Sequence, residues 1–160
     1  MYHTENSARI LVVEDDADIL QVLCAFLKCA GFEVRGIANG QEAIWLIPEF
    51  SPHLLVLDLM MQPVSGFQVL EWLHTNCVTP PLPVLVLTAR THLTDQLQGL
   101  EKGAIEYVTK PTQPSLLVER IRYILSLSEE QRTLLRCRRI DEQRRVLERV
   151  FAPLPDEFVY

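Results

Sequence analysis

The sequence has no long hydrophobic run, no charged leader and no excess of basic residues. No apolar segment reaches roughly 18 residues, the length of a membrane span, and no charged-then-apolar stretch opens the chain. The net charge of -6 and the pI near 5.2 argue against a protein that holds nucleic acid by bulk electrostatics. We therefore expect a cytoplasmic protein without a membrane segment, a signal peptide or direct nucleic-acid binding.

The sequence also lacks the cysteine spacing of a metal or redox site. Its four cysteines show no C-x-x-C pattern and stand among largely apolar neighbours, which predicts packed or surface thiols in a reduced compartment. At 160 residues and 48% hydrophobic, the chain can bury one good core and is neither disordered nor fibrous by composition. One globular domain with a short extension is the expected organisation.

Short apolar runs alternate with amphipathic segments along most of the chain. The apolar runs predict strands at Arg9–Val13, Phe32–Arg35, Leu54–Leu57, Val84–Leu87 and Ile105–Val108. The amphipathic segments predict helices at Ala17–Cys29, Gln41–Ile47, Gly66–His74, Thr94–Glu101 and Ser115–Leu127, the second ending before Pro48. This alternation predicts an α/β fold, a doubly wound five-stranded parallel sheet of order 2-1-3-4-5 with five flanking helices.

Polar side chains follow four of the five predicted strands. Glu14 and Asp15 follow the first strand, Asp58 the third, Thr88 the fourth and Lys110 the fifth. In the predicted strand order these groups converge on one crevice at the carboxyl edge of the sheet. Three carboxylates there need a cation, and hard oxygen ligands suit Mg²⁺, while a hydroxyl and an ammonium suit phosphoryl oxygens. The pattern predicts phosphoryl transfer to Asp58.

Each group alone has a simpler explanation. Asp58 could be a turn aspartate, the acids after the first strand could cap a helix, Thr88 could be a cap and Lys110 could be a solvated loop charge. Complementary groups at four strand ends that share one edge favour the functional interpretation.

Residues 7–127 resemble the receiver domain of bacterial two-component response regulators, which has the flavodoxin-like fold of the chemotaxis receivers. The resemblance is carried, with matching spacing, by I-L-V-V-E-D-D-A-D-I, L-V-L-D-L-M-M, V-L-V-L-T-A and Y-V-T-K-P. The site residues that it implies are the metal ligands Glu14, Asp15, Asp58 and the backbone carbonyl of Met60, the phosphoacceptor Asp58, the switch residues Thr88 and Tyr107, and the phosphate-pairing Lys110.

The resemblance also implies how such a protein works. A sensor histidine kinase or a histidine phosphotransfer protein would be the phosphoryl donor, and phosphorylation would switch the surface of the fourth helix, fifth strand and fifth helix. The protein would not be an enzyme in its own right, although it would assist its own phosphorylation and dephosphorylation. We expect Thr88 to be drawn toward the phosphoryl group and Tyr107 to turn into the vacated space.

The loop after Asp58 departs from the family pattern. Gln62 holds the place where the family usually has proline, and Pro63 follows, which changes the local backbone restriction near Met60. By the resemblance, Met60 and Arg90 flank the approach of the hydrolytic water. Met60 offers no group to hold that water and Arg90 could cover the phosphoryl group, so we expect a long-lived phosphorylated state.

Two other functions fit the pattern less well. A magnesium-dependent aspartyl phosphatase of similar topology would carry a second acid two residues after its nucleophile, where this chain has Met60. A degenerate receiver that only binds partners would not need the complete set of acceptor, acids, hydroxyl and lysine. A receiver that is part of a larger regulator or hybrid kinase, with an output domain absent from this chain, stays open.

Residues 128–160 form a C-terminal extension with seven arginines and seven acids. From Glu129 to Phe151 there is no glycine or proline, which predicts a continuous helix. Its thin apolar seam consists of Leu134, Ile140, Leu147 and Val150. A helix this polar is poorly stabilised unless it pairs or docks, so a dimerisation helix, giving a homodimer, and a solvated linker are both open.

Overall fold

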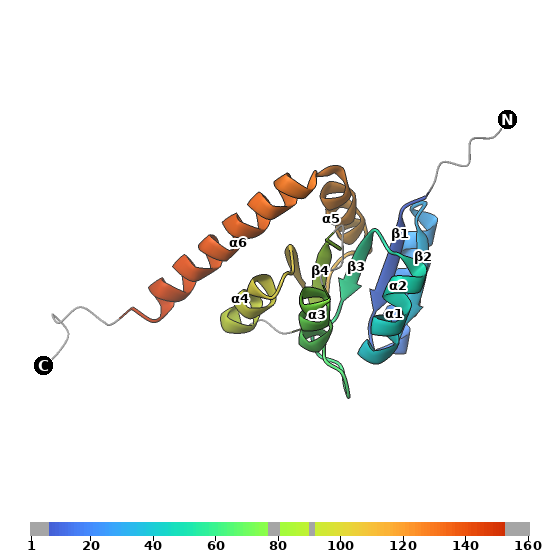
Figure 1. Cartoon of the computed structure of the whole chain (residues 1–160), viewed down its shortest axis with the longest axis horizontal. Helices are drawn as coiled ribbons and strands as arrows, with labels where there is room; N and C mark the ends of the chain where they lie inside the picture. The colour runs from blue at the N-terminus through green and yellow to red at the C-terminus, as the bar shows by residue number, and fades with distance from the viewer. Residues whose placement is uncertain (1–6, 77–80, 90–91, 153–160) are drawn as a thin grey trace, which may run out of the picture.

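The computed structural model describes residues 7–76, 81–89 and 92–152, and strands alternate with helices through most of them. The strands are β1 (Arg9–Val13), β2 (Glu33–Ile37), β3 (Leu54–Leu57), β4 (Val84–Thr88) and β5 (Glu106–Thr109). The helices are α1 (Ala17–Cys29), α2 (Gly40–Phe50), α3 (Gly66–Thr75), α4 (Leu93–Glu101), α5 (Pro114–Ser126) and α6 (Glu129–Val150). All the predicted elements are present (Figure 1).

The strands form one parallel sheet of order β2-β1-β3-β4-β5, which confirms the predicted α/β topology. In the register, Val13 at the end of β1 lies beside Leu57 at the end of β3, and Thr88 of β4 lies beside Thr109 of β5. The residues that directly follow these strand ends therefore meet at one edge of the sheet, as expected for a doubly wound fold.

Successive strand residues face opposite sides of the sheet and pack into two apolar layers. Ile10 and Val12 of β1 pack with α1 and α5, whereas Leu11 and Val13 pack with α2 and α3. The central strands are buried on both faces, and this is why their sequences are unbroken apolar runs rather than alternating patterns.

Local sequence sets both ends of α1. Asp16 is the N-cap, and its carboxylate accepts hydrogen bonds from the backbone N–H groups of Asp18 and Ile19 at 3.0 and 3.1 Å. Gly31 follows the helix with a φ of 99°, a left-handed conformation that glycine adopts without steric cost. These two signals explain why α1 has the predicted bounds.

The prediction that the second helix ends before Pro48 is wrong, because α2 continues through Pro48 to Phe50. Pro48 stands in the last turn, where its missing N–H costs the helix one hydrogen bond, and Phe50 is buried in the core. Packing of Phe50 outweighs the local preference of proline, and the helix ends at Ser51 in a left-handed conformation.

Several other element bounds shift by one or two residues. The predicted strand at Phe32–Arg35 is found at Glu33–Ile37, and the predicted strand at Ile105–Val108 is found at Glu106–Thr109. Side-chain hydrophobicity locates a strand only approximately, because the ends of a strand depend on its backbone hydrogen bonds with the neighbouring strand. Glu106, for example, belongs to β5 because it pairs with Leu85 of β4.

The predicted C-terminal helix is present as α6, which runs back across the side of the molecule that carries α4 (Figure 1). Two of the four predicted seam residues, Leu134 and Val150, are more than half exposed, at 64% and 59%. Ile140 and Leu147 are half-buried. Two of the predicted seam residues thus face solvent and two lie against the receiver. Pairing of α6 with a second copy stays a prediction. Within the described residues, no helix combines the length and apolar character of a membrane span.

Candidate functional site

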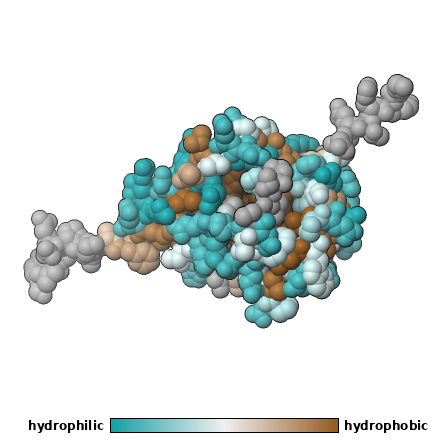
Figure 2. Space-filling view, viewed as in Figure 1, coloured by the Kyte–Doolittle hydropathy of each residue, from teal (hydrophilic) through white to brown (hydrophobic). Residues whose placement is uncertain are grey.

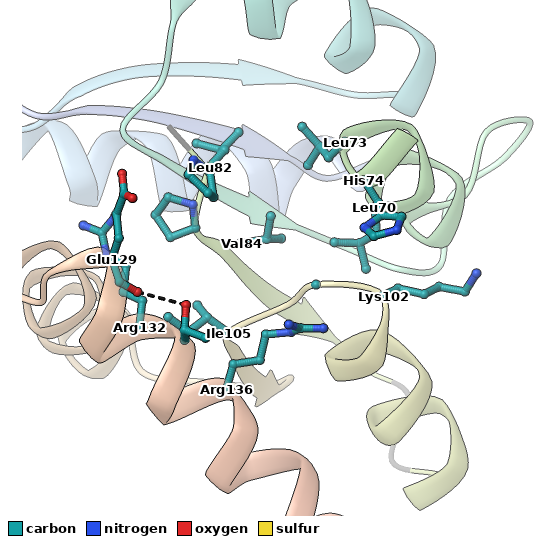
Figure 3. A pocket seen from close by; sticks show the side chains of 14 residues that line it. Leu70, Leu73, His74, Leu82, Val84, Lys102, Ile105, Glu129, Arg132 and Arg136 are labelled. Atoms are coloured by element: carbon teal, nitrogen blue, oxygen red, sulfur yellow. Dashed lines mark hydrogen bonds between the residues drawn. The ribbon is translucent and has the colours of Figure 1, made fainter. Parts of the chain in front are cut away.

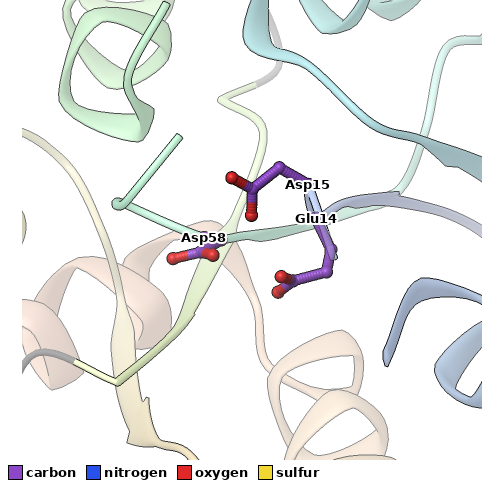
Figure 4. A group of neighbouring side chains, drawn as sticks. All are labelled: Glu14, Asp15 and Asp58. Carbon is purple, nitrogen blue, oxygen red and sulfur yellow. The ribbon is translucent and has the colours of Figure 1, made fainter. Parts of the chain in front are cut away.

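Three carboxylates come together at the carboxyl edge of the sheet. Glu14 and Asp15 follow β1 and Asp58 follows β3, and one carboxylate oxygen from each lies within 4.8 Å of the other two. Figure 4 shows the three side chains facing a common space. Glu14 and Asp58 are buried, at 2% and 4% exposed, while Asp15 is exposed. The sequence prediction that these acids converge is confirmed.

Lys110, directly after β5, supplies positive charge to the same place. Its ammonium group forms an ion pair with Glu14 and a second one with Oδ2 of Asp58 at 3.1 Å. The side chain is only 16% exposed, and the backbone N–H of Lys110 donates to the carbonyl of Thr88 at 2.9 Å. It is not the solvated loop charge that a single lysine usually is.

Burial and neighbouring charge act on the ionisation of this cluster. Burial raises the pKa of Glu14 above its ordinary value; the hydrogen bond from Lys110 opposes this rise and the negative charge of Asp58 adds to it. Burial by itself lowers the pKa of Lys110, but the hydrogen bond to Glu14 and the charge of Asp58 outweigh it, so the pKa is raised. Lys110 is therefore a permanent cation at neutral pH, set among more negative charge than it can balance alone.

The simpler explanations for the acids and for Thr88 do not hold. Asp16 is the N-cap of α1, so neither Glu14 nor Asp15 is the capping residue, although Oε1 of Glu14 accepts the backbone N–H of Asp16 at 3.2 Å. The N-cap of α4 is His92, whereas Thr88 is the buried last residue of β4. Asp58 does form a turn, since its Oδ1 accepts the backbone N–H of Met60 at 2.9 Å, while its other oxygen meets Lys110.

The backbone at the start of α3 packs closely against the loop that carries Asp58 and holds it in place. Gly66 begins α3, and its N–H donates to the carbonyl of Leu59 at 3.1 Å. A Cβ at Gly66 would collide with the carbonyl oxygen of Asp58 and lie 2.6 Å from the Cα of Leu59. Only glycine allows the helix to pack this closely on the loop. Sequence analysis did not identify this role, although a glycine that opens a predicted helix was a signal for it.

The chain is similar in sequence to known proteins. Residues 10–122 match the family model of the response regulator receiver domain, which is more than half of the chain. The chain belongs to the response regulator receiver family. It therefore carries the receiver function of two-component signalling, and the resemblance noted in the sequence is confirmed.

Two curated relatives illustrate the match. The DNA-binding response regulator MtrA of Mycobacterium tuberculosis is 37% identical over 123 residues, which are 77% of this chain and 53% of the relative. The phosphate regulon transcriptional regulatory protein PhoB of Klebsiella pneumoniae is 39% identical over 117 residues, covering 73% of this chain and 51% of the relative. The chain thus spans about half the length of the curated relatives it matches.

Solved structures show the same fold. A response regulator from Chloroflexus aurantiacus superposes with a TM-score of 0.71 at 33% identity, covering 76% of this chain and 99% of that one. The chemotaxis protein CheY4 of Vibrio cholerae superposes with a TM-score of 0.70 at 26% identity, covering 74% of this chain and 98% of that one.

The receiver has its two expected switch residues on neighbouring strands. Thr88 ends β4 and is fully buried, and Tyr107 lies in β5 as a half-buried residue. The Tyr107 ring is next to Gly99 of α4, where a Cβ would come within 3.9 Å of the ring. Movement of this ring would therefore change its contact with α4. The coupling of Thr88 to Tyr107 stays a prediction.

The residues predicted to control phosphoryl lifetime are placed only in part. Met60 has a side chain that is 46% exposed, next to the acceptor in the chain. Arg90 lies outside the described residues. The peptide bond between Gln62 and Pro63 is cis. The role of Met60, both in lifetime and as a metal ligand through its carbonyl, stays a prediction.

Sequence analysis missed a buried acid on the receiver. Glu106 opens β5 and is 3% exposed, and its Oε2 accepts hydrogen bonds from Arg120 of α5 at 2.9 Å and from Arg139 of α6 at 2.7 Å. The signal was a glutamate inside an otherwise apolar strand run. No sequence pattern showed that its second partner would come from the C-terminal helix.

Proposed function

We propose that Asp58 is the phosphoacceptor of this receiver and that Lys110 and a magnesium ion complete its site. The observation that carries the proposal is the buried Asp58 carboxylate, paired with Lys110 at 3.1 Å and within 4.8 Å of the carboxylates of Glu14 and Asp15. No other described group of three or more acids, histidines or cysteines comes together in this way.

The chemistry follows from the positions of these groups. A carboxylate oxygen of Asp58 attacks the phosphorus of the donor, the bond from phosphorus to the donor atom breaks, and an acyl phosphate forms on Asp58. With a phosphohistidine donor the leaving group is the imidazole, and with acetyl phosphate it is acetate. Lys110 stays protonated and pairs with the phosphoryl oxygens, and the hydroxyl of Thr88 is a further donor for them.

The carboxylates fit a magnesium ion. Three hard oxygen donors within 4.8 Å of one another match the preferences of Mg²⁺, which also keeps waters and takes phosphate oxygens as ligands, and the carbonyl of Met60 would be a further ligand. Glu14 and Asp58 share a single ammonium group, that of Lys110, so the three carboxylates leave negative charge for a divalent cation to balance. A bound Mg²⁺ neutralises charge on the phosphoryl oxygens during transfer.

The proposal extends to partners and location. The donor would be a sensor histidine kinase or a histidine phosphotransfer protein, and the protein would be cytoplasmic, in line with the free thiols of Cys24, Cys29 and Cys137. We propose no direct nucleic-acid contact by this chain. Its net charge is -6, and arginines of α6 such as Arg136 and Arg139 are engaged by carbonyls and a carboxylate of the receiver.

The first prediction is that Asp58 is the sole acceptor. Incubation with acetyl phosphate and MgCl2 should add one phosphoryl group to the intact mass, and EDTA should prevent the addition. Asp58→Asn should abolish it, because an amide is not a nucleophile for this reaction. Asp16→Asn is the matched control, since it removes a neighbouring charge and keeps a capping side chain, and it should be phosphorylated like the wild type.

Peptide mapping decides the outcome. A phosphoryl group on Asp58 in the wild type and none in Asp58→Asn supports the proposal. An Asp58→Asn chain that still gains phosphate on another residue would show that the acceptor has been assigned wrongly.

A further inference from the structure

The helix α6 docks on its own receiver through polar bonds to α4. Arg136 donates from Nε to the carbonyl of Leu100 at 2.8 Å and from Nη2 to the carbonyl of Glu101 at 2.9 Å, both in the last turn of α4. Gln143 donates to the carbonyl of Leu93 at 3.3 Å, in the first turn of α4. A cationic side chain at the carbonyls of a helix C-terminus is favourable for both charge and hydrogen bonding.

The same helix also reaches the sheet. Arg139 of α6 and Arg120 of α5 both donate to Oε2 of the buried Glu106, while Oε1 of Glu106 accepts the backbone N–H of Tyr107 at 3.1 Å. A buried carboxylate is costly unless its partners stay in place. Glu106 therefore depends on α6 for part of its charge balance.

Apolar packing in this docking is limited to half-buried side chains, among them Leu135, which packs against the core. No residue of α6 is fully buried, and a cavity of about 370 Å³ remains beneath its first turns, between Leu70, Val84 and Arg136 (Figure 3). The surface over α6 is mainly hydrophilic, with apolar residues toward its C-terminal end (Figure 2). The position of α6 thus depends on directional polar bonds, which are lost when the two sides shift by little more than an ångström.

Strand β5 connects the acidic site to the contacts that hold α6. Lys110, directly after β5, binds Asp58 and Glu14, and Glu106, at the start of the same strand, binds Arg139 of α6. Between them, Tyr107 lies against α4, the helix to which Arg136 is bonded. A new dianionic group on Asp58 would draw Lys110 out of its present pairing, and the displacement would reach β5 and α4.

We propose that α6 is an intramolecular cover of the α4–β5 surface that is docked in the unphosphorylated protein and released when Asp58 is phosphorylated. This inference rests on the proposed function of Asp58. The bonds of α6 fit the arrangement in which Lys110 pairs with Asp58 and Glu14, so a state that changes this arrangement binds α6 less well. By linkage, docked α6 must oppose phosphorylation by the same factor.

Hydrogen exchange with mass spectrometry on the full chain measures release directly. In the unphosphorylated protein the amides from Arg136 to Val150 should be protected, because the tertiary contacts of docked α6 supply most of the stability of a polar helix. Addition of acetyl phosphate and MgCl2 should raise their exchange about tenfold, a coupling of ordinary size. Asp58→Asn under the same conditions should show no change.

Two substitutions on α6 separate docking from helix propensity. Arg139→Gln removes the bond to Glu106 and should raise exchange in α6 several-fold before any phosphorylation. It should also increase the phosphorylated fraction at limiting acetyl phosphate, by reciprocity. Arg138→Gln makes the same chemical change at the neighbouring exposed position and should alter neither quantity.

The outcomes distinguish this inference from the function on which it rests. If intact mass shows phosphate on Asp58 and exchange in α6 is unchanged, the cover is not released and the inference is wrong, while the proposed function stands. If Asp58 gains no phosphate in the wild type, the proposed function fails and the coupling fails with it. An Arg139→Gln chain that exchanges like Arg138→Gln would show that Glu106 does not hold α6.

Discussion

At the scale of single residues, charge balance explains the site. Glu14 and Asp58 are almost fully buried, and a single ammonium group, that of Lys110, contacts both. Burying like charges side by side is unfavourable unless a cation offsets them. The buried carboxylates therefore lower stability at one edge of the sheet. Their excess negative charge attracts a divalent ion, and that ion together with Lys110 would stabilise the negative oxygens of an incoming phosphoryl group.

Glycine at position 66 keeps the acceptor loop in place, and its replacement should be costly. Gly66→Ala puts a Cβ against the carbonyl of Asp58 and 2.6 Å from the Cα of Leu59. Because both neighbours are backbone, the loop must move, and we expect a loss of about 1–3 kcal/mol in the free energy of unfolding. Urea denaturation followed by circular dichroism measures it.

A second glycine is the control for this substitution. A Cβ at Gly99 would meet its nearest atoms at 3.8 and 3.9 Å, which is ordinary contact, and the residue lies inside α4. Gly99→Ala should therefore leave the free energy of unfolding unchanged or raise it by about 0.5–1 kcal/mol. Equal losses in the two variants would contradict a special close approach at Gly66.

At the scale of elements, periodicity in the sequence predicted every strand and helix, and it failed where a bound depended on distant contacts. The bounds of α1 were correct because Asp16 and Gly31 are local signals. The end of α2 was wrong because burial of Phe50 outweighs Pro48. The site residues at the strand ends were predictable because each follows an apolar run and the topology brings those ends together.

The orientation of α6 could not be predicted from its apolar residues. A search for an apolar seam selects Leu134 and Val150, which are exposed, and misses Arg136 and Arg139, whose partners are carbonyls and the carboxylate of Glu106. Carbonyl partners leave no trace in the sequence, since every residue has one. This is the physical reason why the docked face was missed.

Removal of α6 should leave the receiver folded but weaker. A chain that ends at Leu127 loses the bonds of Arg136, Arg139 and Gln143, and Glu106 keeps only the bonds from Arg120 and the Tyr107 N–H. We expect a single cooperative urea transition with a free energy of unfolding lower by about 1–3 kcal/mol, the cost of a buried group that loses a partner. A chain that ends at Ala152 retains α6 and should match the full chain. Loss of cooperative unfolding in the shorter chain would mean that α6 belongs to the core.

At the scale of the whole molecule, magnesium should stabilise the fold. An ion that binds only the folded state raises the free energy of unfolding by about 2.7 kcal/mol at a concentration 100-fold above its dissociation constant. We expect the Tm of the wild type to rise with MgCl2 in the absence of any phosphoryl donor. The readout needs no activity.

Variants at the site and away from it test where the ion binds. Asp15→Asn and Asp58→Asn each remove one of three carboxylates and should reduce the rise in Tm. Asp18→Asn removes an exposed acid of α1 outside the cluster and should leave the rise unchanged. A rise of equal size in all four proteins would place the ion elsewhere.

The polar character of the contact between α6 and α4 also bears on solubility. The bonds of Arg136 and Gln143 join groups that water satisfies equally well once they part. Detachment also removes Leu135 from the core and opens the cavity beside Leu70 and Val84 to water. Detached molecules should therefore be less soluble than docked ones at high protein concentration, because these apolar side chains become accessible.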